Sequence, residues 1–142
     1  MRWLDEIVAI GEDNIVARVV IRQDALLHEA DRGMPAWVGI EYMAQAANAY
    51  SGFEDRLQGR IPRVGLLLGC RRYLCDRAYF ATGAMLNVWA KIQLRDENDL
   101  VAFDCRIELD GVQIATADLK AIRPHDLGPI IARSSGADRS PT

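Results

Sequence analysis

The stretch of residues 35–50 constrains the fold more than any other part of the chain, because it predicts a long helix with almost no charge. Alanine and methionine favour the helix, and no proline follows Pro35 until Pro62. Pro35 suits a first helical position, and Gly52 lies where a C-terminal cap is expected. A helix that is apolar on every side belongs in a protein interior. We therefore expect a central, enclosed helix.

Three polar side chains interrupt this apolar helix, and their spacing places them on one stripe. They are Glu41, Gln45 and Asn48. A carboxylate in apolar surroundings is costly unless it is paired, protonated or employed in chemistry. A buried Glu satisfied by backbone donors or by an Arg is the structural alternative. Because perturbed acids cluster at functional sites, we expect Glu41 to be functional and Gln45 to orient the site by hydrogen bonding.

Length and composition exclude several classes of protein. The chain has 142 residues, of which 50% are apolar and 26% charged, as in a single soluble domain. A net charge of −3 argues against general nucleic-acid binding. No apolar run approaches the roughly 20 residues of a membrane span, and no signal-peptide pattern is present. The three cysteines form no metal or redox motif. We expect a cytoplasmic protein with no metal and no cofactor.

The rest of the chain predicts mainly strands. Two short strands come first, at 3–10 and 15–21, and a polar irregular stretch over 22–34 leads into the helix. A polar connection is expected over 53–62, and a loop with a turn over 79–83. Asp110-Gly111 is the strongest hairpin signal. The predicted strands after the helix form a four-stranded antiparallel meander over 63–74, 84–94, 100–109 and 112–122.

These elements predict an α+β fold. A single helix this apolar must be covered, and only the sheet is available to cover it. A curved antiparallel sheet wrapped around one long central helix is the hot-dog fold. We expect residues 1–124 to form this single domain. Residues 125–142 gather Gly, Ser, Pro and Asp without a period, and they predict a flexible C-terminal tail.

Several motifs resemble a known enzyme family. Residues 41–45, Glu-Tyr-Met-Ala-Gln, resemble the Glu-x-x-Ala-Gln helix signature of hot-dog dehydratases that act on 3-hydroxyacyl groups of acyl carrier protein. Residues 35–45, together with 67–73 and 103–107, are similar to the dehydratase-like proteins of aryl-polyene pigment clusters. In such dehydratases a His precedes the helix and a glutamate lies on it. His28 and Glu41 occupy those places, with a spacing one residue shorter than in the better-known motif.

The resemblance implies dehydration of 3-hydroxyacyl thioesters carried on acyl carrier protein, in fatty-acid or polyene-type biosynthesis. Loss of water needs a base for the C2 proton, an acid for the departing hydroxyl and donors for the thioester oxygen. His28 suits the base, and Glu41 suits the acid. No capping side chain occurs before the helix. We therefore expect the N–H groups at its start to bind the thioester oxygen or substrate, with Gln45 nearby; they belong to Ala36, Trp37 and Val38.

A basic cluster completes the candidate site. Six arginines and one acidic residue occur between residues 56 and 77. A solvated surface is the structural explanation for any one of them. As a cluster, they suit a phosphopantetheine linker and an acidic carrier protein, and we assign this role to Arg63, Arg71 and Arg72. We expect a homodimer, or a heterodimer with another hot-dog protein. Two alternatives remain: a hot-dog thioesterase using Glu41 as a base, and a non-catalytic acyl-binding subunit that pairs with an active hot-dog partner.

Overall fold

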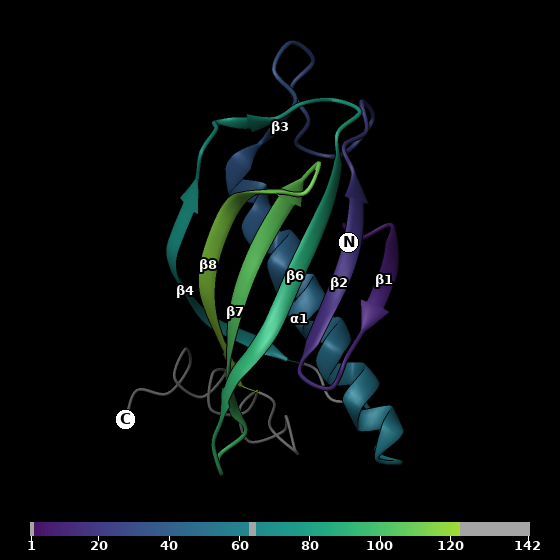
Figure 1. Cartoon of the computed structure of the whole chain (residues 1–142), viewed down its shortest axis with the longest axis vertical. Coiled ribbons are helices and arrows are strands. Elements are labelled where there is room, and N and C mark those ends of the chain that lie inside the picture. Colours follow the sequence, from purple (N-terminus) through teal and green to yellow (C-terminus); the bar gives the residue numbers. More distant parts are fainter. Residues whose placement is uncertain (1, 63–64, 123–142) are drawn as a thin grey trace, which may run out of the picture.

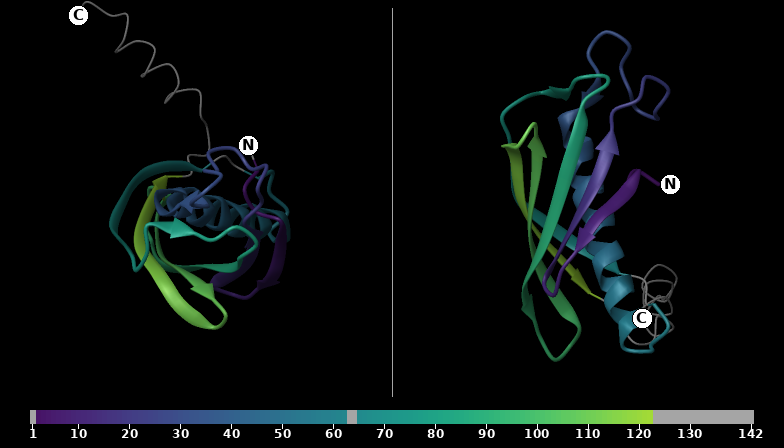
Figure 2. Two further views of the ribbon diagram at one scale, coloured as in Figure 1. Left: turned by 90° about the horizontal axis from the view of Figure 1, so that it is seen from above. Right: turned by 45° about the vertical axis from the view of Figure 1, so that its right-hand side comes forward.

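The computed structural model describes residues 2–62 and 65–122, which form a curved six-stranded antiparallel sheet with one long helix against its concave face (Figure 1). Seen from above, the strands curve around the helix (Figure 2). Strand order in the sheet is β1-β2-β6-β7-β8-β4. These strands are β1 (Glu6–Ile10), β2 (Asn14–Val20), β6 (Met85–Arg95), β7 (Leu100–Leu109), β8 (Val112–Ile122) and β4 (Leu66–Cys75).

The helix is held against the sheet by one apolar face. A short 3₁₀ turn, η1 (Ala36–Val38), leads into α1 (Gly39–Leu57). Tyr42, Met43 and Ala46 are almost wholly buried on α1, and they pack in one core with inward-facing strand residues such as Val88 and Phe103. Burial of large apolar side chains is the main driving force for this arrangement. The predicted wrap of a sheet around one central helix is confirmed.

The C-terminal end of the helix differs from the prediction. Gly52 lies inside α1 and caps nothing, so the predicted cap is wrong, and residues 53–57 are helical where a polar connection was expected. The glycine that ends the helix is Gly59, with φ of 71°. Its N–H donates to the Arg56 carbonyl at 3.0 Å, and the N–H of Arg60 donates to the Asp55 carbonyl at 2.8 Å. These two bonds form a Schellman motif, which needs the left-handed conformation that glycine adopts freely.

An ion pair fastens this helix end. Asp55 is fully buried, and its carboxylate accepts hydrogen bonds from the Arg60 guanidinium at 2.9 and 3.2 Å. Asp55 is the buried member of this pair, since the Arg60 side chain is 40% exposed. This ion pair helps to hold the helix end beyond Gly52, where the sequence predicted a C-terminal cap.

The strand boundaries follow the prediction closely, but the strand order does not. Strands β7 and β8 match the predicted ranges, and Asp110 and Gly111 have φ of 53° and 78°, as a tight type I′ hairpin requires. Strands β6, β7 and β8 form a meander, whereas β4 pairs with the far side of β8. The predicted four-stranded meander is therefore wrong, because β2 already pairs with the remaining side of β6.

Two further features position the site. A two-stranded ribbon joins β3 (Met34–Pro35) to β5 (Tyr79–Phe80), where the sequence predicted only a loop for the second partner. Strand β4 carries register shifts between Leu67 and Gly69 and between Arg71 and Leu74, which mark bulges or irregularities in its pairing with β8.

The predicted C-terminal tail, residues 125–142, lies outside the described residues, as does Arg63. Within the described ranges, no helix is long and apolar enough to cross a membrane.

Candidate functional site

The start of the helix is fixed by contacts from two strands. The N–H of Ala36 donates to the Ala78 carbonyl at 2.9 Å, just before β5. The Tyr73 hydroxyl, from β4, donates to the Ala36 carbonyl. Burial raises the pKa of Tyr73 above its ordinary value, so this hydroxyl stays protonated and able to donate. The first turn of the helix is thus anchored to the sheet edge formed by β4.

Gly39 lets this anchor approach closely. A Cβ at this position would lie 2.3 Å from the Tyr73 hydroxyl and 2.9 Å from the Ile107 side chain. Only glycine leaves room for both neighbours. Both residues lie within the stretches that resemble the dehydratase-like proteins, but sequence reasoning missed their contact, because it joins residues that are distant in the chain.

No side chain caps the helix start, as the sequence predicts. Because the Ala36 N–H is bonded to Ala78, it is not available to a ligand in this arrangement. The next N–H groups belong to Trp37 and Val38, and donors in a first helical turn lack acceptors within the helix. Trp37 is 56% exposed and lies four residues before Glu41, a spacing that places both on the same side of the helix.

The outward side of α1 is open, so the prediction of a fully enclosed helix is wrong. Glu41 and Asn48 are exposed, and Ala44 is half-buried. A single sheet covers one face of a helix, and the opposite face stays uncovered in one chain. Among residues 2–62 and 65–122, no hydrogen bond or ion pair engages the Glu41 carboxylate. We call the open stripe formed by Trp37, Glu41, Ala44 and Asn48 the helix crest.

Gln45 points to one side of this crest and binds the N-terminal segment. Its side-chain oxygen accepts hydrogen bonds from the N–H groups of Trp3 at 2.7 Å and Leu4 at 3.3 Å. The Trp3 ring also packs edge-on against Tyr42, with centroids 5.8 Å apart. The Gln of the helix signature therefore fastens the segment that precedes β1 to the central helix.

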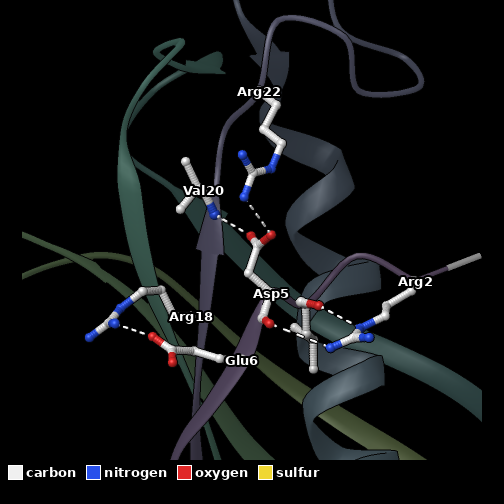
Figure 3. Close-up of polar contacts among 7 residues, drawn as sticks. Arg2, Asp5, Glu6, Arg18, Val20 and Arg22 are labelled. Atoms are coloured by element: carbon white, nitrogen blue, oxygen red, sulfur yellow. Dashed lines mark hydrogen bonds and ion pairs between the residues drawn. The ribbon is translucent and has the colours of Figure 1, made fainter.

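Asp5 joins the same N-terminal segment to the end of β2 and the residues that follow it (Figure 3). Its carboxylate accepts the Val20 N–H at 2.6 Å and pairs with the Arg22 guanidinium at 3.0 Å. Arg2 donates to the carbonyls of Leu4 and Asp5 from the same segment. Sequence reasoning missed Asp5, because an acidic residue before a strand carries no local signal for such a contact.

His28 lies in the irregular loop between β2 and β3. Its Nε2 is 2.6 Å from the Thr82 hydroxyl, in the loop after β5, and the residue is half-buried. The preceding residue, Leu27, has φ of 71°, a conformation that non-glycine residues rarely adopt. No hydrogen bond or ion pair joins His28 to Glu41 within the described chain. One chain alone does not bring the two candidate catalytic residues into contact.

The predicted basic cluster is partly paired. Arg60 binds Asp55, and Arg77 binds its neighbour Asp76. Arg71 and Arg72 are exposed on β4, and no hydrogen bond or ion pair engages them within the described residues. They lie on the strand whose outer edge pairs with no other strand of the described part of the chain.

Two hollows flank the helix crest. On the β4 side, a small pocket of about 60 Å³ lies between α1 and the strands β7 and β8. On the other side, a shallow groove of about 370 Å³ lies between α1 and β1, beside Gln45 and Asn48. All three cysteines are free thiols, and burial raises the pKa of Cys105. Within the described ranges, no group of three or more potential metal ligands occurs.

Solved structures with the same fold include dehydratases and thioesterases. A chain of the dehydratase heterocomplex ApeI:P from Xenorhabdus doucetiae is similar, with TM-score 0.83 and 25% identity, over 93% of this chain and 89% of that one. The PaaI protein of the E. coli phenylacetic acid degradation operon has TM-score 0.63 and 14% identity, over 83% and 78%. A hypothetical thioesterase with coenzyme A, from Streptococcus pneumoniae TIGR4, has TM-score 0.64 and 11% identity, over 83% and 84%.

The last two likenesses establish the hot-dog fold alone, because their identities are low. No curated protein matches the chain. A model of the ApeP-like family, described as ApeP dehydratase, matches residues 1–132. Since this match spans nearly the whole chain, the protein belongs to the ApeP-like dehydratase family and is a dehydratase-like lyase of the hot-dog fold.

Proposed function

We propose that this chain dehydrates 3-hydroxyacyl thioesters carried on acyl carrier protein, in polyene-type biosynthesis, together with a second hot-dog chain. The observation that carries the proposal is the position of Glu41. It is a carboxylate with no hydrogen-bond or ion-pair partner among the described residues, on an open helix crest, in a chain of a dehydratase family. A structural glutamate would be expected to have a partner, whereas a catalytic acid must be accessible to substrate.

The reaction assigns one role to each group. A base removes the proton from C2, an acid protonates the hydroxyl on C3, and the C2–C3 double bond forms as water leaves. Negative charge on the thioester oxygen during this step requires donors. We assign the acid to Glu41, the base to His28, and the donors to the N–H groups of Trp37 and Val38.

The need for a second chain follows from the open edge of the sheet. Among residues 2–62 and 65–122, strand β4 pairs only with β8, and its other edge has no partner strand. Leu67, Leu68 and Leu74 are 44%, 59% and 67% exposed on this strand. An unpaired ten-residue edge with exposed leucines favours pairing with another strand. A partner attached there would lie beside the helix start, because Tyr73 links β4 to Ala36.

Such a partner would also explain why His28 and Glu41 make no contact in one chain. In a two-chain site, the base of one chain can face the acid of the other across the interface. The neighbouring heterocomplex of two dehydratase chains supports pairing with a different hot-dog protein. A homodimer is the second possibility, and the experiment below distinguishes them.

The carrier protein is the proposed macromolecular partner. Arg71 and Arg72 present guanidinium groups on β4, near the proposed interface. Arginine binds phosphate by paired hydrogen bonds, and a basic patch attracts an acidic protein. Arg63 belongs to the same proposed patch by its sequence position. We assign the reaction to the cytoplasm, a reducing compartment that suits three free thiols.

The test is mass spectrometry of a 3-hydroxyacyl carrier protein after three separate incubations. The first contains this chain alone, the second contains the second hot-dog chain alone, and the third contains both chains. The proposal expects loss of water from the thioester, with full rate only in the mixture or in a homodimer. Release of a free acid would indicate a thioesterase instead. Activity in the mixture that survives Glu41→Gln would indicate a non-catalytic subunit.

Carrier recognition has a matched control. Arg71→Gln with Arg72→Gln should reduce the rate on carrier-bound substrate and leave the rate on the same acyl group attached to free pantetheine unchanged. Lys91→Gln removes a positive charge from an exposed site on β6, and it should change neither rate. Equal effects of both changes would contradict a specific carrier surface.

A further inference from the structure

The small pocket on the β4 side of the helix crest contains one polar side chain that is buried without a partner. Its lining includes Ala44, Ala47, Asn48, Ser51, Phe103 and Leu119. Ser51 is 1% exposed, and its hydroxyl has no hydrogen-bond partner within the described residues. Buried polar groups are nearly always hydrogen-bonded, and an unmet one costs free energy. The hydroxyl therefore needs an explanation.

The pocket lies farther along α1 than Glu41, and Ala44 and Asn48 belong to both the helix crest and the pocket lining. Ser51 lies ten residues beyond Glu41, which is roughly 15 Å along a helix that rises 1.5 Å per residue. Ala44 and Ala47 lie between them on the β4 side of α1, and both line the pocket. Their small side chains leave space between the helix and the sheet, where larger residues would fill it.

The walls determine the chemistry of an occupant. Phe103 and Leu119 are buried and apolar, so the pocket suits the end of a hydrocarbon chain. At its far end, Ser51 offers a hydroxyl that can donate one hydrogen bond and accept others. The combination fits an apolar chain with a hydrogen-bonding atom at its end.

We propose that Ser51 is a specificity-determining residue, which binds a hydrogen-bonding atom at the far end of the acyl chain. This inference rests on the proposed dehydration at Glu41. The substrate class is a 3-hydroxyacyl thioester whose chain spans roughly 15 Å from Glu41 and ends in a hydroxyl or carbonyl oxygen. Shorter chains do not reach Ser51 and gain nothing from it.

The test compares pairs of 3-hydroxyacyl thioesters of equal length, one ending in a methyl group and one in a hydroxyl, over a series of lengths. The protein is the full chain with whichever partner it requires. We expect kcat/KM to favour the hydroxyl-ended substrate by about three- to tenfold at the length that reaches Ser51, the range of one hydrogen bond. Short pairs should show no preference.

Ser51→Ala should abolish this preference and leave the rate on short chains unchanged. Thr116→Val removes a half-buried hydroxyl from β8, outside the pocket, and it should keep the preference. A preference that survives Ser51→Ala, or that is absent at every length in the wild type, would overturn the inference. Failure to dehydrate even short substrates would instead reject the proposed function.

Stability gives an independent readout. Removing a buried hydroxyl that has no partner should leave the free energy of unfolding unchanged or raise it. Destabilisation by Ser51→Ala would show that the hydroxyl is bonded within the protein, to the Ala47 carbonyl one turn earlier for example. That result would also overturn the role of Ser51 in substrate binding.

Discussion

Gly39→Ala should destabilise this protein, although alanine is the better helix former. The new Cβ would lie 2.3 Å from the Tyr73 hydroxyl, 2.9 Å from the Ile107 side chain and 3.3 Å from Phe80. The Tyr73 hydroxyl cannot simply swing away, because it donates to the Ala36 carbonyl. Either that hydrogen bond breaks, or the first turn of the helix shifts away from β4.

The contributions can be compared in magnitude. Overpacking a core costs about 1–3 kcal/mol, and losing one hydrogen bond costs about 1 kcal/mol. Replacing a helical glycine by alanine returns about 1 kcal/mol. The net effect is a loss of about 1–3 kcal/mol in the free energy of unfolding. For a chain of this size, each kcal/mol corresponds to roughly 4 °C in Tm.

Urea denaturation of matched variants provides the assay. Gly52 lies in the same helix, and the nearest atom to a new Cβ there is 4.0 Å away, so Gly52→Ala should stabilise by up to about 1 kcal/mol. Tyr73→Phe removes the obstructing hydroxyl, so Gly39→Ala should cost less in that background. If Gly39→Ala stabilises as much as Gly52→Ala does, the close packing at the helix start is refuted.

Three further variants test the site and the helix end. Glu41→Gln should lower the dehydration rate on the order of 10²–10⁴-fold. Its Tm should stay close to that of the wild type, because Glu41 has no hydrogen-bond or ion-pair partner among the described residues. A large drop in Tm would assign Glu41 a structural role. The His28→Ala and Glu41→Gln proteins should each be inactive. If the two residues act across a two-fold homodimer interface, mixing the proteins should restore activity at no more than about a quarter of the sites. An active His28→Ala protein would exclude His28 as the essential base. Asp55→Ala should destabilise by about 1–3 kcal/mol, since the helix end loses the charge-assisted hydrogen bonds between Asp55 and the Arg60 guanidinium, while the Arg60 side chain, 40% exposed, stays hydrated; an unchanged free energy of unfolding in urea would contradict that account.

The sequence determined the features that depend on neighbours along the chain. The apolar run from Pro35 predicts the central helix, and the Asp110-Gly111 turn predicts the hairpin between β7 and β8. Periodicity and turn chemistry act over a few residues, and such local signals survive into the fold. The motif around Glu41, together with residues 67–73 and 103–107, also pointed to the family that matches residues 1–132, because each of these motifs can be read locally in the chain.

Tertiary structure decided the features that depend on residues far apart in the chain. β4 joins β8, and Gln45 binds the backbone of the segment before β1, contacts that no local pattern encodes. Gly39 is required because the Tyr73 hydroxyl lies close to it. Gly52 does not end the helix, which continues to an end held by the ion pair between Asp55 and Arg60. The apolar helix sequence also did not predict that Glu41 is exposed. Glu41 is exposed because the sheet covers only one face of the helix. Packing between distant elements, rather than propensity along the chain, fixes where each side chain points.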